Sequence, residues 1–190
     1  GALMEALLAL LIGVLTALLL PNLNAGGRYR ELNREAASLA ARIRVAQDDA
    51  MLAGREYGIV FSSEGYRFVA WDAQLSRFRA VLPSEAPWSV RLFDEDIRVV
   101  ASADADESIL VVPEPLGDAA TDADVAAANA GEGEPDYQPS VYVLSSGEVT
   151  PFTAVFRAEG EDRAVTLQVD ALGNRIDADA PPSPGTAAGG

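Results

Sequence analysis

Hydrophobic residues fill the start of the chain almost without interruption. Residues 2–20 are apolar except for Glu5 and Thr16. Nineteen helical residues rise about 29 Å at roughly 1.5 Å each, close to the roughly 30 Å hydrocarbon core of a bilayer. Neither a preceding basic region nor a small-residue cleavage site marks the segment as a cleavable signal peptide. The pattern therefore predicts a retained transmembrane anchor helix over residues 1–20.

A segment that weakens the helix follows at residues 21–27. Pro21 lacks a backbone donor, and Gly26 and Gly27 each cost about 1 kcal/mol of helix propensity relative to alanine. The sequence therefore predicts a kink or a melted turn here. Such a break would let the anchor change its angle to the segment that follows.

Helical periodicity returns over residues 28–53. Six apolar residues recur at spacings of four and three and form one stripe: Leu32, Ala36, Leu39, Ile43, Ala46 and Ala50. Gly54 is the expected C-cap. We expect this packing face to cover the sheet of the chain's own domain, with contact between the N-terminal half of the helix and other subunits as the alternative.

After Gly54 the period changes from 3.6 to 2, which is typical of strands. Short runs rich in aromatic and β-branched residues alternate with polar turns. They span residues 56–61, 66–71, 77–82, 88–93, 97–101, 108–112, 141–144, 149–156, 164–169 and a hairpin at 171–176. The predicted fold class is α+β: a long N-terminal anchor helix followed by an antiparallel β-sandwich over residues 56–177, within one domain over residues 28–177.

Two stretches have compositions that do not favour a packed core. Residues 113–139 are rich in acids, alanine and glycine, and we expect a long, mobile surface loop there. Its Asp118, Asp122 and Asp124 suggest calcium, but their spacing does not fit an EF-hand, so no metal site is predicted. The tail, residues 178–190, reads as disordered.

The composition narrows the range of catalytic chemistry that the chain could perform. The 190 residues include no histidine, cysteine or lysine. A Ser-His-Asp triad, a Ser-Lys pair and a cysteine nucleophile are therefore all excluded. No glycine-rich phosphate loop is present either. We expect a protein that is not an enzyme and that has no catalytic residue and no cofactor.

The charge argues against nucleic acid as a partner. The formal net charge is −15, and all 14 basic residues are arginines. An overall negative field repels phosphates unless a local basic face overcomes it. The candidate face consists of Arg28, Arg30, Arg34, Arg42 and Arg44. We interpret it as a solvated helix face with (i, i+4) pairs such as Arg44 with Asp48, and phosphate binding there is the less favoured alternative.

The motifs resemble a known family. An N-terminal apolar helix with Glu5, then Gly13 and Pro21, resembles the class of type IV pilins and type II secretion pseudopilins. Residues 39–68 and 146–174 look like the minor pseudopilin H group, the GspH/FimT family. The family usually opens with phenylalanine, whereas this chain opens with Gly1 and Ala2, which leaves the exact processing site open.

The resemblance implies a structural subunit at or near the tip of the periplasmic pseudopilus of a type II secretion system, which aids export of folded proteins. It implies processing by prepilin peptidase, N-methylation and a single-pass anchor in the inner-membrane lipid before assembly. The partners would be other minor pseudopilins and the major pseudopilin. Glu5 would pair with an amino terminus, either that of Gly1 or that of a neighbouring subunit. The alternative is a FimT-like minor type IV pilin involved in DNA uptake or pilus assembly.

Overall fold

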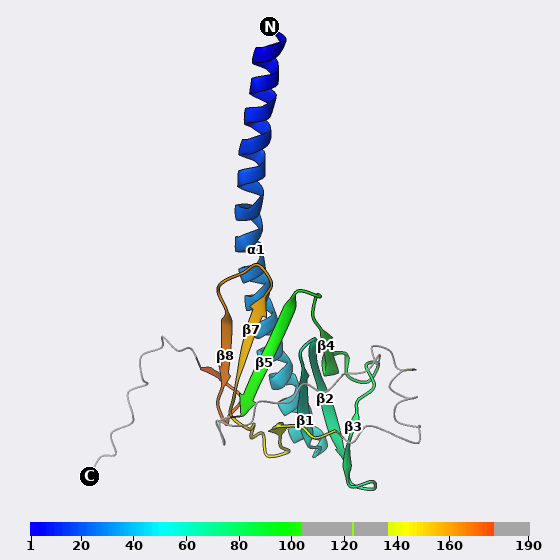
Figure 1. Cartoon of the computed structure of the whole chain (residues 1–190). Helices are drawn as coiled ribbons and strands as arrows, with labels where there is room; N and C mark the ends of the chain where they lie inside the picture. The colour runs from blue at the N-terminus through cyan, green and yellow to red at the C-terminus, as the bar shows by residue number, and fades with distance from the viewer. Residues whose placement is uncertain (104–122, 124–136, 177–190) are drawn as a thin grey trace, which may run out of the picture.

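The computed structural model describes residues 1–103, 123 and 137–176, except for the side chains of residues 7–25. A long helix, α1 (Ala2–Ala53), projects from a domain built of two antiparallel sheets (Figure 1). The mixed helix and antiparallel-sheet fold predicted from the sequence is confirmed. The predicted strand at 108–112, the tail at 178–190 and most of the predicted loop at 113–139 lie outside the described residues.

Helix α1 is continuous and ends where the sequence predicts. Gly54 adopts the left-handed conformation, with φ 59° and ψ 35°, and its N–H donates to the carbonyl oxygen of Ala50. The expectation of a melted turn at residues 21–27 is wrong, because the helix runs through Pro21, Gly26 and Gly27. Extending a helix that is already nucleated on both sides outweighs local propensity costs of about 1 kcal/mol per glycine. A kink on assembly stays a prediction.

Within the described residues, no helical stretch combines the length and the apolar character needed to cross a bilayer. Most side chains of the predicted anchor, those of residues 7–20, are not among the described ones.

The first sheet has the strand order β3-β2-β1-β6, with β4 also paired to β2. Its strands are β1 (Tyr57–Ser62), β2 (Gly65–Asp72), β3 (Arg77–Ala80), β4 (Val90–Leu92) and β6 (Val141–Val143). The strand predicted over residues 88–93 begins late, because Pro87 opens a short 3₁₀ turn, η1 (Pro87–Ser89), that contains Trp88. Proline supplies no donor for a ladder and suits the first position of a helical turn.

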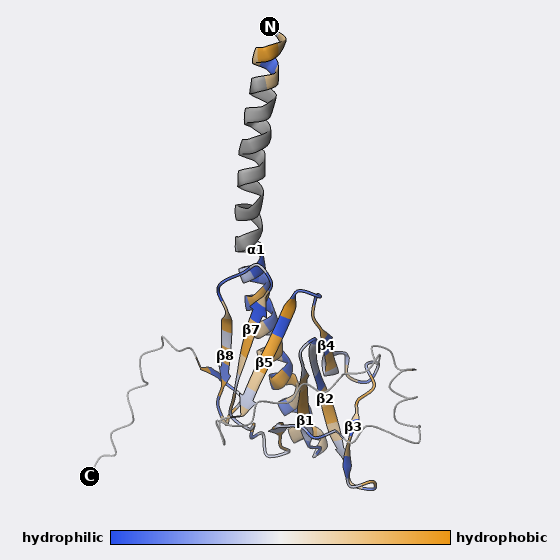
Figure 2. Ribbon diagram, in the orientation of Figure 1, coloured by the Kyte–Doolittle hydropathy of each residue, from blue (hydrophilic) through white to orange (hydrophobic). Residues whose placement is uncertain are grey.

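The second sheet has the order β5-β7-β8-β9. Its strands are β5 (Ile97–Ala103), β7 (Phe152–Ala158), β8 (Val165–Val169) and β9 (Arg175–Ile176). Apolar and polar segments follow each other along β5 in Figure 2. Its inward positions are buried, and its outward positions Arg98 and Val100 are exposed. This alternation directs one face of the sheet into the core.

Both sheets share their core with α1, which packs against β7, β8, β6 and η1. The sheets also contact each other directly, since the rings of Phe61 on β1 and Phe152 on β7 lie 5.7 Å apart. The opposite face of the first sheet carries a second, smaller cluster around Val60, Val69 and Tyr137. The result is one helix held between inner faces that belong to two sheets.

Gly65 offers a test of this packing. A Cβ added there would overlap the backbone carbonyl oxygen of Arg91 on the neighbouring strand. We expect Gly65→Ala to lower the free energy of unfolding by about 1–3 kcal/mol, because neither strand can move without breaking its ladder. Thermal unfolding of the full-length chain in detergent, followed by circular dichroism, would measure the loss.

The matched control is Gly27→Ala. A Cβ at Gly27 meets no atom within 4 Å, and Gly27 is helical. This variant should unfold at the wild-type temperature or slightly above it, since alanine restricts the unfolded chain. A Gly65→Ala variant as stable as Gly27→Ala would contradict the packing described here.

Candidate functional site

The candidate site is helix α1, which has a projecting part and a part seated on the sheets (Figure 1). Leu32 is the first buried residue among the described residues of α1, so the seated part spans residues 32–53. What the molecule can do depends on two features: the chemistry of the projecting tip and the contacts that fix the seated part.

The tip carries the acid that the sequence singles out. The backbone N–H groups of Met4 and Glu5 donate to the carbonyl oxygen of Gly1, at 3.0 and 3.4 Å. The carboxylate of Glu5 therefore lies in the first helical turn, where the helix dipole favours a negative charge. Glu5 is exposed, and among the described residues no ion pair joins it to the Gly1 amino group. No described residue therefore neutralises the Glu5 carboxylate, so it can pair with a cation from another molecule.

The packing stripe lies on the seated part of α1. All six of its residues have an exposed fraction of 0%: Leu32, Ala36, Leu39, Ile43, Ala46 and Ala50. Because half of them are alanines, the sheets approach the helix backbone closely. The stripe covers the sheets of its own domain, which is the first of the two interpretations given above.

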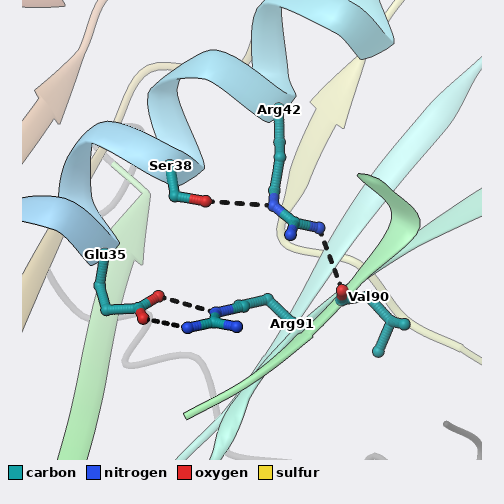
Figure 3. Close-up of polar contacts among 5 residues, drawn as sticks. All are labelled: Glu35, Ser38, Arg42, Val90 and Arg91. Carbon is teal, nitrogen blue, oxygen red and sulfur yellow. Dashed lines mark hydrogen bonds and ion pairs between the residues drawn. The ribbon is translucent and has the colours of Figure 1, made fainter. Parts of the chain in front are cut away.

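A charged pair locks the helix to the first sheet. Arg91 on β4 donates two hydrogen bonds to the carboxylate of Glu35, one from Nε to Oε2 at 3.0 Å and one from a terminal nitrogen to Oε1 (Figure 3). Glu35 is 5% exposed, and its hydrogen bond raises the pKa of Arg91. A nearly buried carboxylate needs such a bidentate partner, so this contact fixes where β4 sits along the helix.

Arg42 makes a second connection one to two turns further along. One terminal nitrogen donates to the carbonyl oxygens of Trp88, at 2.7 Å, and Val90, at 3.0 Å. Its Nε donates to Ser38 Oγ at 3.2 Å (Figure 3). The guanidinium lies 6.0 Å from the ring centroid of Tyr66, whose pKa is raised to about 12 by burial. Arg42 thus satisfies carbonyl groups where the 3₁₀ turn meets β4.

Gln47 connects the helix to two turns near the end of the domain. Its amide nitrogen donates to the carbonyl oxygens of Gly147, at 2.7 Å, and Leu172, at 2.9 Å. Gly173 must be glycine here, because it has φ +78° and a Cβ would overlap the Gln47 amide. The side chain is only 7% exposed, so these bonds pin the last turns of the seated helix.

Two further contacts surround the point where α1 leaves the domain. Arg28 forms an ion pair with Asp96, in the turn between β4 and β5. The guanidinium of Arg163, beyond β7, lies 4.0 Å from the ring centroid of Tyr29. The helix is therefore contacted by two different turns at its exit from the domain.

The five-arginine face predicted from the sequence does not exist as one patch. Arg28 and Arg42 are used in contacts within the domain, whereas Arg30, Arg34 and Arg44 are exposed. Arg44 donates to Asn174 Oδ1 at 3.2 Å, so the pairing with Asp48 is wrong for this structure. Helical periodicity in the sequence distinguishes the buried face of α1 from its exposed face. It cannot identify a partner such as Asn174, which lies 130 residues from Arg44.

The sequence did not predict the polar contacts that hold α1 on the sheets. Glu35, Arg91 and Gln47 carry no motif, and their partners are distant in the sequence. The available signal was weak: Glu35 and Gln47 each directly adjoin a residue of the apolar stripe, on the side that faces the sheets.

The described residues contain little that suggests chemistry at a bound group. No group of three or more potential metal ligands lies among them. A cavity of about 580 Å³ opens beside Trp71, and its charged lining residues are Arg55, Asp72, Arg79 and Glu85. Asp72 pairs with Arg79 at 3.4 Å.

Comparison with known proteins gives a consistent result. The family model for type II transport protein GspH matches residues 35–173. The type II secretion system protein H of Pseudomonas aeruginosa PAO1 is 29% identical over 167 residues, which cover 84% of this chain and 83% of the relative.

Solved structures show the same fold. The minor pseudopilin EpsH from the type 2 secretion system of Vibrio cholerae matches with a TM-score of 0.54 at 19% identity, over 77% of this chain and 94% of that one. A second structure of EpsH from the same organism gives a TM-score of 0.52 at 19% identity, over 74% and 88% of the two chains.

The contact between Glu35 and Arg91 generates a stability prediction. Replacing Glu35 with glutamine removes the charge that compensates Arg91, and the side chain of Arg91 is 41% exposed, so water screens part of the loss. We expect Glu35→Gln to lower the free energy of unfolding by about 1–2 kcal/mol in denaturant titrations. Adding Arg91→Gln should cost less than the sum of the single changes.

The control is Glu56→Gln, which neutralises an exposed acid and should change stability by less than about 0.5 kcal/mol. Strict additivity of the Glu35 and Arg91 variants would show that the two side chains do not interact.

A second prediction concerns pH. The hydrogen bond with Asp94, burial and repulsion from Asp94 raise the pKa of Glu31 above its usual 4.5. Because the folded-state pKa is raised, the folded protein binds this proton more tightly than the unfolded chain does. The resulting stabilisation is full below pH 4.5 and is lost as pH rises through the folded-state pKa.

Asp94→Asn removes this repulsion. The difference in stability between the variant and the wild type should therefore grow in favour of the variant as pH rises from about 4 to 7. Thermal unfolding at several pH values would measure it. A difference that does not change with pH would refute the coupling.

Proposed function

Because the chain belongs to the GspH family, we propose that it is a minor pseudopilin of a type II secretion system, a subunit of the periplasmic pseudopilus that aids export of folded proteins. The observation that supports this most strongly is the match of the family model to residues 35–173. The seated part of α1 and both sheets fall largely within that range. The proposed role is structural rather than catalytic.

The finer parts of the proposal concern placement. We infer that the two sheets act as a pseudopilin β-sandwich at the end of a single-pass inner-membrane anchor over residues 1–20. Prepilin peptidase would process the chain, and methylation would follow. The assembled subunit would lie at or near the pseudopilus tip, beside other minor pseudopilins and the major pseudopilin. The long helix that projects from the domain supports this placement.

The mechanism rests on Glu5. A carboxylate in the apolar part of a bilayer costs a few kcal/mol unless it is paired. In the proposed assembly, the Glu5 carboxylate neutralises the amino terminus of a neighbouring subunit as the anchor leaves the lipid. The remaining apolar side chains exchange lipid contacts for helix contacts with little hydrophobic gain, so packing and the charge pair decide the register.

The segment at residues 21–27 would then act as a hinge. Its helix is continuous in the isolated chain, but Pro21 removes one hydrogen bond and two adjacent glycines lower the cost of bending. The seated part of α1 cannot turn independently of the domain, so adjustment between domain and filament core would concentrate in this segment.

Replacing Glu5 tests the charge pairing. We expect Glu5→Ala to reduce incorporation into the pseudopilus and secretion by at least tenfold, because the partner amino terminus would lose its counter-charge. Co-purification with the other pseudopilins, together with secretion assays, would measure the effect. Asp48→Ala, which removes an exposed acid from the seated part of the same helix, is the control and should assemble normally. Normal assembly by Glu5→Ala would refute the pairing.

A further inference from the structure

Two exposed arginines stand out where α1 leaves the domain. Arg30 and Arg34 are four residues apart, so they lie on the same helix face, and both are exposed. Neither forms an ion pair with any residue in the described part of the chain. Arg28, by contrast, pairs with Asp96, and Arg91 pairs with Glu35.

Repulsion between these two arginines is an unfavourable contribution in the isolated chain. Like charges at (i, i+4) destabilise a helix by a few tenths of a kcal/mol, and Glu31, three residues before Arg34, offsets part of this cost. The chain has 29 acids and 14 arginines, so acidic residues are plentiful. Even so, none of those in the described part of the chain forms an ion pair with Arg30 or Arg34. The face continues through Ala37 and Ala41, which are exposed and small, so another protein surface can approach the helix backbone closely.

We propose that the face formed by Arg30, Arg34, Ala37 and Ala41 is a docking surface for a carboxylate-bearing surface on a neighbouring pseudopilin. This inference rests on the proposed function. It assigns a contact between subunits outside the filament core, where the apolar anchor helices would pack. The physical basis is charge complementarity: two guanidinium groups without an ion pair in the described part of the chain attract carboxylates of the partner, and the alanines leave room for its surface.

The position of the arginines favours protein over lipid. If the anchor ends at residue 20, Arg30 and Arg34 lie about 15 and 21 Å further along the helix, whereas the headgroup layer is only roughly 5–8 Å thick. A domain of this fold can present carboxylates at this level: in this chain the exposed Glu95 adjoins Asp96, the partner of Arg28.

Cross-linking from this face provides the test. The chain contains no cysteine, so Ala37→Cys introduces a unique thiol on the exposed face. The full-length variant, in membranes that contain its secretion system, would be treated with a thiol-specific photo-cross-linker, and the products would be identified by mass spectrometry. We expect cross-links to another pseudopilin. Adding Arg30→Glu and Arg34→Glu should reduce their yield about tenfold, because attraction becomes repulsion.

Two matched variants separate charge from other effects. Arg30→Lys with Arg34→Lys keeps the charge and should retain the yield within about threefold. Arg55→Glu with Arg157→Glu reverses two exposed arginines elsewhere on the domain and should retain it as well. Circular dichroism should show that the charge-reversed variant unfolds within a few degrees of the wild type, since neither arginine forms an ion pair with another described residue.

The outcomes are distinct. An undiminished yield in the charge-reversed variant would overturn the docking surface, as would cross-links from Ala37→Cys only to lipid or only to a second copy of this chain. The proposed function would survive those results if Glu5→Ala still blocked assembly. It would fail if the wild-type chain did not co-purify with any pseudopilin.

Discussion

Burial of one stripe of α1 is the constraint on which the rest of the structure depends. The stripe is half alanine, so two sheets reach the helix backbone and share a single core with it. The two sheets cover part of each other's inner face, and α1 covers much of the rest. The helix is therefore fixed in rotation, and that rotation decides which of its side chains remain available to other molecules.

Polar contacts fix the position of the sheets along the helix axis, which apolar packing alone does not. Glu35 with Arg91, Arg42 with the carbonyl groups near η1, and Gln47 with two turns are geometrically specific bonds in mostly buried surroundings. They connect the helix to both sheets over 46 to 125 residues of sequence. A shift of one helical turn would break all of them, so they specify one arrangement where alanines alone would permit sliding.

The sequence predicted much of this fold because local patterns determined it. The stripe from Leu32 to Ala50, the cap at Gly54 and most strand positions followed from periodicity and turn residues. The continuity of the helix through Pro21 was not predicted, because cooperative helix extension outweighed local propensity. The partners of Arg28, Arg42 and Arg44 could not be predicted either, because they depend on how distant turns meet the helix. The resemblance to a family supplied the function, which no motif of reactive residues could.

The polar contacts distributed along α1 have a mechanical consequence. The bonds at Arg28, Glu35, Arg42 and Gln47 are spread along the helix axis, roughly in the direction in which a pull on the projecting part would act. Such a pull loads them in shear, so they share the tension and must rupture together. Peeling, in which bonds fail one after another, would require a force across the helix. The domain should therefore resist a pull along the helix axis better than a pull across it.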